Sequence, residues 1–178
     1  MDRRRGLVLL TLIGLAAACS GKPPQTPAKA AGSVGSGTAE ELEPAIVRDL
    51  DLVRLATAKF RDVKAAQAAG YPVVRQCLSH PLQGAMGHHF IKRALLDDQL
   101  DVEHPEILLY APAGPDKYEL TGVEYIVPYS AWSGQEPPRI FGQALKKSDQ
   151  LQLWYLHVWA WRENSAGLFA DWNAAVKC

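Results

Sequence analysis

Three residues in this chain are of the types that bind metal ions or transfer protons inside proteins: His89, Glu124 and His157. Imidazole nitrogens and carboxylate oxygens bind zinc, iron or manganese, and the same groups act as general acids and bases. The three residues lie far apart in the sequence, so only the fold can bring them together. If they face one cavity, they form a His/His/carboxylate site, for which zinc, iron and manganese are the cofactors to consider.

Glu124 lies in residues 117–127, which have the clearest strand pattern in the chain. Side chains alternate between the two faces of a strand, and this alternation places Glu124 on the more apolar face. That face is predicted to carry Tyr118, Leu120, Gly122, Glu124 and Ile126. A buried carboxylate requires a partner, because removing an isolated charge from water is unfavourable. Glu124 is therefore either half of a structural pair with an Arg or a His, or a metal ligand or general base.

His157 lies in residues 151–161, which are apolar on both faces and indicate a central strand or a buried helix. On a strand, its own face carries mostly aromatic side chains. Two interpretations stay open: a core histidine satisfied by hydrogen bonds, or a ligand or proton carrier in an aromatic-lined pocket. His88 and His89 are adjacent and point to opposite faces of a strand, so at most one of them joins a shared site.

Three classes of function are compatible with these residues. In the first, the protein binds a metal ion or a small ligand in a pocket formed by His89, Glu124 and His157. In the second, it is a non-enzymatic structural or interaction protein of the cell envelope, whose buried polar groups satisfy one another without a metal. In the third, it is a hydrolase or isomerase that uses Glu124 as base and His157 as acid. Catalytic residues stay unassigned, because the sequence has no nucleophile-elbow serine and no phosphate-binding glycine loop.

The positions of glycine, proline and apolar residues predict an α+β domain. Residues 39–69 have apolar positions every three or four residues, which indicates a helix whose true start lies near Pro44. The remaining chain alternates short β-like runs with turns, including a glycine-bounded turn at 84–87 and a hairpin made by 106–110 and 117–127. We therefore expect one long N-terminal helix packed on a mostly antiparallel sheet or small barrel.

The N-terminus has the layout of a bacterial secretory signal peptide: a short basic start, an apolar run at 7–18 and then Cys19. The apolar run is too short for a membrane span, which needs about 20 residues. A cysteine at the cleavage point resembles the lipobox of bacterial lipoproteins, and this resemblance implies a lipid anchor, including palmitate, on Cys19. The alternative is ordinary cleavage after Ala18 and secretion of the free protein.

The expected domain organisation follows from this leader. Residues 1–18 are the signal peptide, residues 19–38 hold the lipidation cysteine and a flexible tether, and residues 39–178 form a single globular domain. The expected location is the bacterial cell envelope, on its periplasmic or extracellular side, with the membrane as partner through the lipid. The chain has 19 basic and 19 acidic residues, and its mature part has no run of Lys and Arg, which argues against nucleic acid as a partner.

The chain has three cysteines: Cys19, Cys77 and Cys178. If Cys19 carries lipid, the other two remain in an oxidising compartment. A Cys77–Cys178 disulfide is then the simplest expectation. A free reactive thiol and a metal ligand are the alternatives.

Several segments together resemble a family of uncharacterised bacterial secreted proteins and lipoproteins. The segments are GAMGHHF at 84–90, PEILLY at 105–110 with GVEY at 122–125, and LHVWAW at 156–161 followed by DWN at 171–173. By this resemblance, the matching histidine of the first segment is His89, and other residues occupy position 88. Glu124 and His157 fall inside the later segments, so the resemblance supports a shared site. It implies no particular reaction, because no activity is attached to the family.

Overall fold

The computed structural model describes residues 42–178. The predicted signal peptide at 1–18 and tether at 19–38, together with Cys19, lie outside the described residues. The predicted organisation of the N-terminus therefore stays a prediction.

The N-terminal helical segment begins at Pro44 and has one break. Helix α1 (Pro44–Thr57) is followed directly by a 3-10 turn, η1 (Ala58–Arg61). Proline is favourable in the first turn of a helix because it has no N–H to leave unbonded. The predicted run to residue 69 is interrupted at Asp62, which has extended backbone angles and accepts a hydrogen bond from the Lys64 amide. Helix α2 (Val63–Ala68) starts from this cap.

An open antiparallel sheet follows, with the strand order β1–β2–β3–β4–β8–β7. Its strands are β1 (Val73–His80), β2 (Gly84–Ile91), β3 (Ile107–Pro112), β4 (Tyr118–Pro128), β8 (Leu153–Val158) and β7 (Lys146–Ser148). A 3-10 turn, η2 (Arg93–Leu95), lies between β2 and β3, and β5 (Arg139–Ile140) pairs with β6 (Gln143–Ala144) in a separate ribbon. The predicted α+β class is confirmed, and the sheet is open rather than closed into a barrel.

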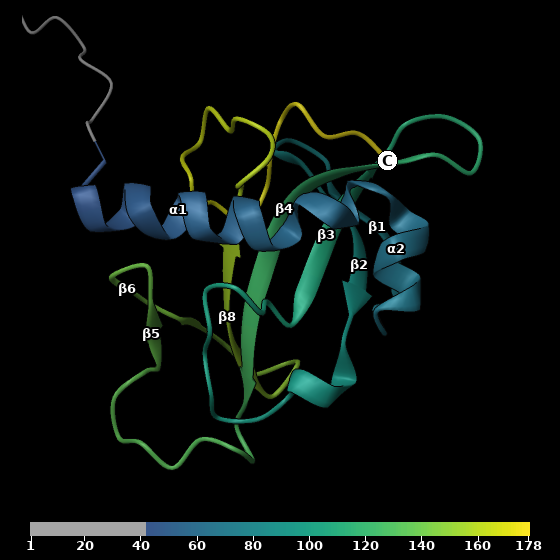
Figure 1. The fold of residues 1–178 in the computed structure, drawn as a ribbon. Helices are drawn as coiled ribbons and strands as arrows, with labels where there is room; N and C mark the ends of the chain where they lie inside the picture. The colour runs from purple at the N-terminus through teal and green to yellow at the C-terminus, as the bar shows by residue number, and fades with distance from the viewer. Residues whose placement is uncertain (1–41) are drawn as a thin grey trace, which may run out of the picture. The chain divides into compact units, whose positions relative to one another are not determined.

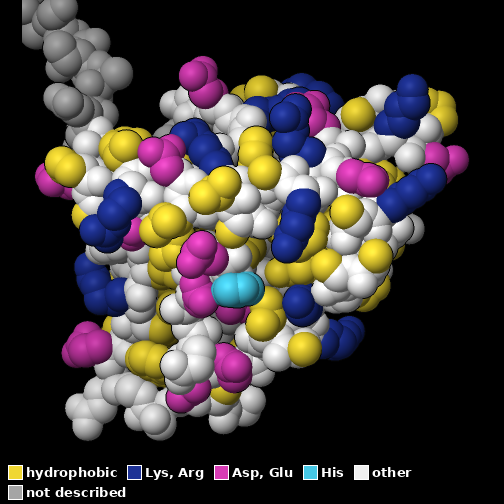
Figure 2. Space-filling model, viewed as in Figure 1, with side chains coloured by type: hydrophobic (Ala, Val, Ile, Leu, Met, Phe, Trp, Pro, Cys, Tyr) yellow, Lys and Arg dark blue, Asp and Glu magenta, His cyan; other side chains and the backbone are white. Residues whose placement is uncertain are grey.

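The helices cover one face of this sheet, as Figure 1 shows where α1 crosses in front of β8 and β4. The main core forms between them and includes Val53 of α1, Phe90 of β2, Tyr125 of β4 and Leu156 of β8. On the helix side, basic and acidic side chains are interspersed over the surface (Figure 2). Burial of this apolar face accounts for the stability of the layered arrangement.

The opposite face of the sheet carries a smaller apolar cluster, Ile107, Leu109 and Ile126. The C-terminal segment crosses one end of the sheet, where Asn173 forms a β-bridge with Ala85. Val176 is fully buried there, in a third cluster with Ala85 and other apolar residues. The chain end is therefore an integral part of the domain.

Residues 84–87 are the beginning of β2, so the predicted turn at these residues is wrong. The turn lies just before them, at residues 81–83. Gly84 and Gly87 have φ values of 94° and 95°, which only glycine adopts readily. A Cβ on Gly87 would lie 2.5 Å from the carbonyl oxygen of Tyr110, so the pairing of β2 with β3 also requires a glycine here.

A β-bulge in β4 changes which side chains share a face with Glu124. Leu109 of β3 pairs with Gly122, but Tyr110 pairs with Leu120, so Thr121 is an extra residue in β4. Leu120 consequently packs in the main core on the helix side. The predicted face was correct for Glu124 with Ile126 and wrong for the residues before the bulge.

Cys77 and Cys178 form a disulfide, as predicted, and the bond joins residues that are 101 positions apart in the sequence. The bond attaches the last residue of the chain to β1. Disulfides form and persist in oxidising compartments, so this bond favours an extracytoplasmic location. Among residues 42–178, none of the helices is long and apolar enough to cross a membrane.

Candidate metal centre

Three strands bring His89, Glu124 and His157 together on the face opposite the helices. Glu124 of β4 pairs directly with His157 of β8. His89 comes from β2, where it pairs with Leu109 of the intervening strand β3. Its side chain therefore reaches across β3 toward Glu124. The potential ligand atoms of the three residues all lie within 4.8 Å of one another, which confirms the predicted convergence.

Each oxygen of the Glu124 carboxylate faces one imidazole. Oε2 lies 3.4 Å from Nε2 of His89, and Oε1 lies 3.7 Å from Nε2 of His157. Both separations exceed the usual hydrogen-bond range of about 2.7–3.2 Å. Two ligand atoms bound to one tetrahedral metal ion, with bonds of about 2.0–2.1 Å, lie about 3.3 Å apart. The two O–N separations are close to this value. The arrangement of donor atoms therefore suits an ion.

All three side chains are buried: His89 is 5%, Glu124 6% and His157 1% exposed. A carboxylate in such a place requires a compensating positive charge, from a metal or from a protonated histidine. Neither ring nitrogen of His157 has a hydrogen-bond partner within residues 42–178. Buried polar atoms are rarely left in this state, and the exceptions often mark an ion, a water molecule or a functional group.

A fourth polar residue, Asp171, lies beside this group, and the sequence pattern did not identify it as a site residue. Its Oδ1 is 3.6 Å from Nδ1 of His157, on the side of the ring away from Glu124. Burial raises the pKa of the Asp171 carboxyl, but the interactions with His157 and Lys146 outweigh it and lower the pKa to about 2. Asp171 lies in the irregular C-terminal segment, where no periodicity indicates which way a side chain points.

Glu106 is a second buried carboxyl that sequence analysis did not single out. It is 1% exposed, and its Oε2 accepts a hydrogen bond of 3.1 Å from the amide of Ile126. Burial raises the pKa of Glu106 to about 8, and that hydrogen bond offsets only part of the effect. His88, in contrast, packs edge-on against the ring of Tyr118, with 5.2 Å between ring centroids. It lies apart from the group, as expected.

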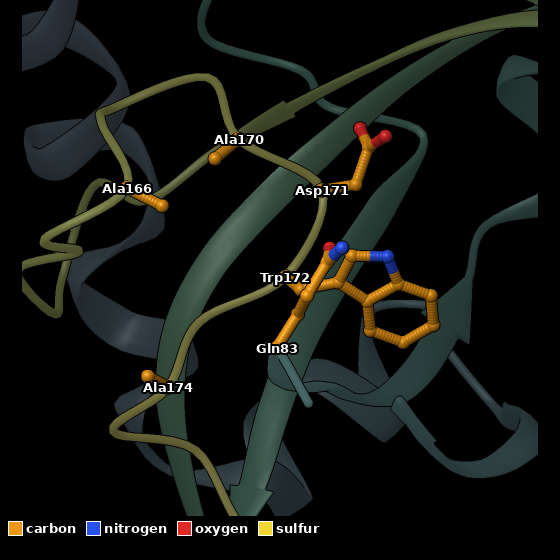
Figure 3. Close-up of a pocket in the computed structure, with 6 residues that line it drawn as sticks. All are labelled: Gln83, Ala166, Ala170, Asp171, Trp172 and Ala174. Carbon is orange, nitrogen blue, oxygen red and sulfur yellow. The ribbon is translucent and has the colours of Figure 1, made fainter. Parts of the chain in front are cut away.

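Two surface pockets lie outside this group. One, of about 290 Å³, is lined by Gln83, Ala166, Ala170, Asp171, Trp172 and Ala174. Figure 3 shows the side chains of Asp171 and Trp172 on the same side of the C-terminal segment, with Gln83 beside the indole. The other, of about 540 Å³, lies next to the disulfide and His88. Neither pocket is lined by His89, Glu124 or His157, so Asp171 is the point where this polar group meets a surface hollow.

The fold and the geometry define a class of site: a buried centre of two histidines and one carboxylate on an open antiparallel sheet. Neither a protein-family model, nor a curated protein, nor a solved structure matches this chain.

Proposed function

We propose that this domain binds one metal ion through Nε2 of His89, the carboxylate of Glu124 and Nε2 of His157. The observation that carries the proposal is the convergence of these three buried donors within 4.8 Å. A cation between them supplies the positive charge that the Glu124 carboxylate requires. It also gives a partner to Nε2 of His157, which has no hydrogen bond within the described part of the chain.

The donor set favours zinc, iron or manganese. Imidazole suits zinc and iron, and a carboxylate suits manganese as well as iron and zinc. Calcium and magnesium prefer sites made of oxygen ligands, and two of the three donors here are nitrogens. Three protein ligands leave at least one coordination position to water or a small molecule.

Burial favours binding over catalysis on a large substrate. The three side chains are 6% exposed or less, and none of them lines either of the two pockets described above. A hydrolase or isomerase that uses Glu124 as base and His157 as acid requires an opening to this face of the sheet. The competing proposal is a metal-free structural group, in which a protonated histidine neutralises Glu124.

Metal analysis of the protein separates these proposals. Protein purified without added metal is expected to contain about one zinc, iron or manganese ion per chain by mass spectrometry. After chelation, adding back the same metal at 100 times its Kd is expected to raise the free energy of unfolding by about 2.7 kcal/mol. His104→Ala is the matched control and should retain the metal, because His104 is an exposed histidine that pairs with Asp101 at the surface. If the purified protein contains no metal and its stability does not change when zinc, iron or manganese is added, the metal-free structural pairing of Glu124 with a protonated histidine is supported instead.

We also propose that Cys19 carries a lipid that holds the domain at a bacterial membrane. The basic start, the short apolar run and the position of Cys19 support this proposal, and the Cys77–Cys178 disulfide is compatible with export. Cys19→Ser is expected to move the protein from the membrane fraction to the soluble fraction after cell lysis. A wild-type protein found wholly in the soluble fraction contradicts the anchor and favours the secreted alternative.

A further inference from the structure

The imidazole of His157 lies between two carboxylates. Its Nε2 is 3.7 Å from Glu124, and its Nδ1 is 3.6 Å from Asp171. A neutral imidazole carries one proton, so only one of its two nitrogens can offer a lone pair to a metal. What lies at Nδ1 therefore decides which nitrogen can act as the ligand.

The carboxylate of Asp171 is held in place from several sides. Its Oδ1 accepts a hydrogen bond of 2.5 Å from Nζ of Lys146, and its Oδ2 lies 3.4 Å from the hydroxyl of Tyr155. The same Lys146 donates to the carbonyl of Phe169, two residues earlier in the chain. The carbonyl of Ala170 accepts a hydrogen bond from the indole of Trp159. These contacts fix both the side chain and the backbone that carries it.

We propose that Asp171 is the positioning residue of the metal centre: on metal binding, its 3.6 Å separation from Nδ1 of His157 closes to a hydrogen bond, so that Asp171 accepts the Nδ1–H and Nε2 faces the ion. The inference rests on the proposed function, because it concerns how the same site is tuned. A carboxylate that accepts the outer N–H of a metal-bound histidine fixes the orientation of the ring and increases the basicity of the ligating nitrogen. Lys146 and Tyr155 act one step further out, by fixing Asp171.

The chain offers a matched control for Asp171. Asp149 is also held by a lysine and a tyrosine, since it lies 3.1 Å from Nζ of Lys147 and accepts a hydrogen bond of 3.2 Å from Tyr129. Asp149 is exposed and lies in the turn after β7. Neutralising it removes the same kind of charged contact without touching His157.

The test measures zinc affinity by competition with a coloured chelator. Asp171→Asn is expected to weaken binding by about 10–100-fold, the range usual for loss of such a partner. Asp171→Glu is expected to recover part of the loss, and Asp149→Asn to leave the affinity unchanged. Equal affinity of the wild-type protein and Asp171→Asn overturns the inference but leaves the metal site standing. A wild-type protein that binds no zinc overturns the proposed function and the inference together.

A second measurement uses only the wild-type protein, in case Asp171→Asn does not fold. Nitrogen-15 NMR of the zinc-loaded protein shows which ring nitrogen of His157 carries the proton. A protonated Nδ1, with a proton resonance shifted downfield by its hydrogen bond, supports the positioning role. A protonated Nε2, with zinc on Nδ1, overturns it.

Discussion

Glu124 and His157 are direct cross-strand partners on β4 and β8, with Nε2 of His157 3.7 Å from Oε1 of Glu124. Residues opposite each other on antiparallel strands place their side chains on the same face of the sheet. The contact is therefore determined by the register of two strands, and a slip of one residue would move one of the two side chains to the helix side. His89 completes the group from β2, beyond the intervening strand β3.

Removing His157 should weaken metal binding more than removing any residue outside the group. His157→Ala deletes one of three protein ligands, so we expect affinity to fall by more than about 100-fold, beyond the effect of losing an outer hydrogen-bonding partner. Isothermal titration of the chelated protein measures this loss. His88→Ala is the control, because His88 packs against Tyr118 instead of joining the group. Similar losses in both variants would contradict the assignment of His157 as a ligand.

Glu124→Gln should destabilise the metal-free protein by about 1–3 kcal/mol, because it disturbs a buried charged interaction with two histidines. Urea unfolding in the presence of a chelator measures the change. Glu119→Gln on the same strand is the control, since Glu119 is exposed and pairs with Arg162 at the surface. We expect that control to change stability by about 1 kcal/mol or less. An unchanged or increased stability of Glu124→Gln would show that the carboxylate has no favourable partner in the metal-free fold.

Cys178→Ser should lower the free energy of unfolding by about 2–5 kcal/mol, as is usual when a native disulfide is removed from a small domain. The bond joins residues 101 positions apart, so its loss increases the freedom of most of the unfolded chain. Urea unfolding with and without a reducing agent measures the effect. The wild-type protein should lose a similar amount on reduction, and the variant should not respond. Two unmodified thiols in the oxidised wild-type protein, detected by mass spectrometry, would rule the bond out.

Glu106 should make the metal-free protein less stable as the pH rises from about 4.5 to about 8. Its pKa is about 8 in the fold and close to the ordinary value of 4.5 in the unfolded chain, so the folded state binds the proton more tightly between these limits. Stability therefore falls with rising pH in this window and changes no further above it. Relative to Glu106→Gln, the wild-type protein should lose on the order of 4–5 kcal/mol across the window, since the pKa rises from 4.5 to about 8 on folding and each pKa unit is worth about 1.4 kcal/mol.

The measurement for Glu106 is a series of urea unfolding curves at several pH values for the two proteins. Glu103→Gln is the control, because Glu103 is an exposed glutamate three residues earlier. The difference between wild type and this control should stay constant with pH. If the difference in unfolding free energy between wild type and Glu106→Gln is also constant with pH, Glu106 ionises normally in the folded protein.

Local periodicity predicted the secondary structure and the face on which Glu124 lies, because both depend on neighbours within a few residues. The apolar spacing predicted the N-terminal helix, and proline at position 44 correctly marked its beginning. The strand alternation correctly placed Glu124 with Ile126. It failed before Gly122, because the bulge at Thr121 depends on how β3 pairs with β4, which no local pattern records.

The sequence by itself determined the α+β class, the pairing of the only two cysteines that follow Cys19, and the residue types of the candidate site. Only the tertiary structure decided that His89 reaches Glu124 across β3 and that Asp171 returns from the chain end to face His157. The physical reason is range. Helix and strand preferences act over a few residues, whereas this site is assembled by strand order, by register and by a C-terminal segment with no periodicity of its own.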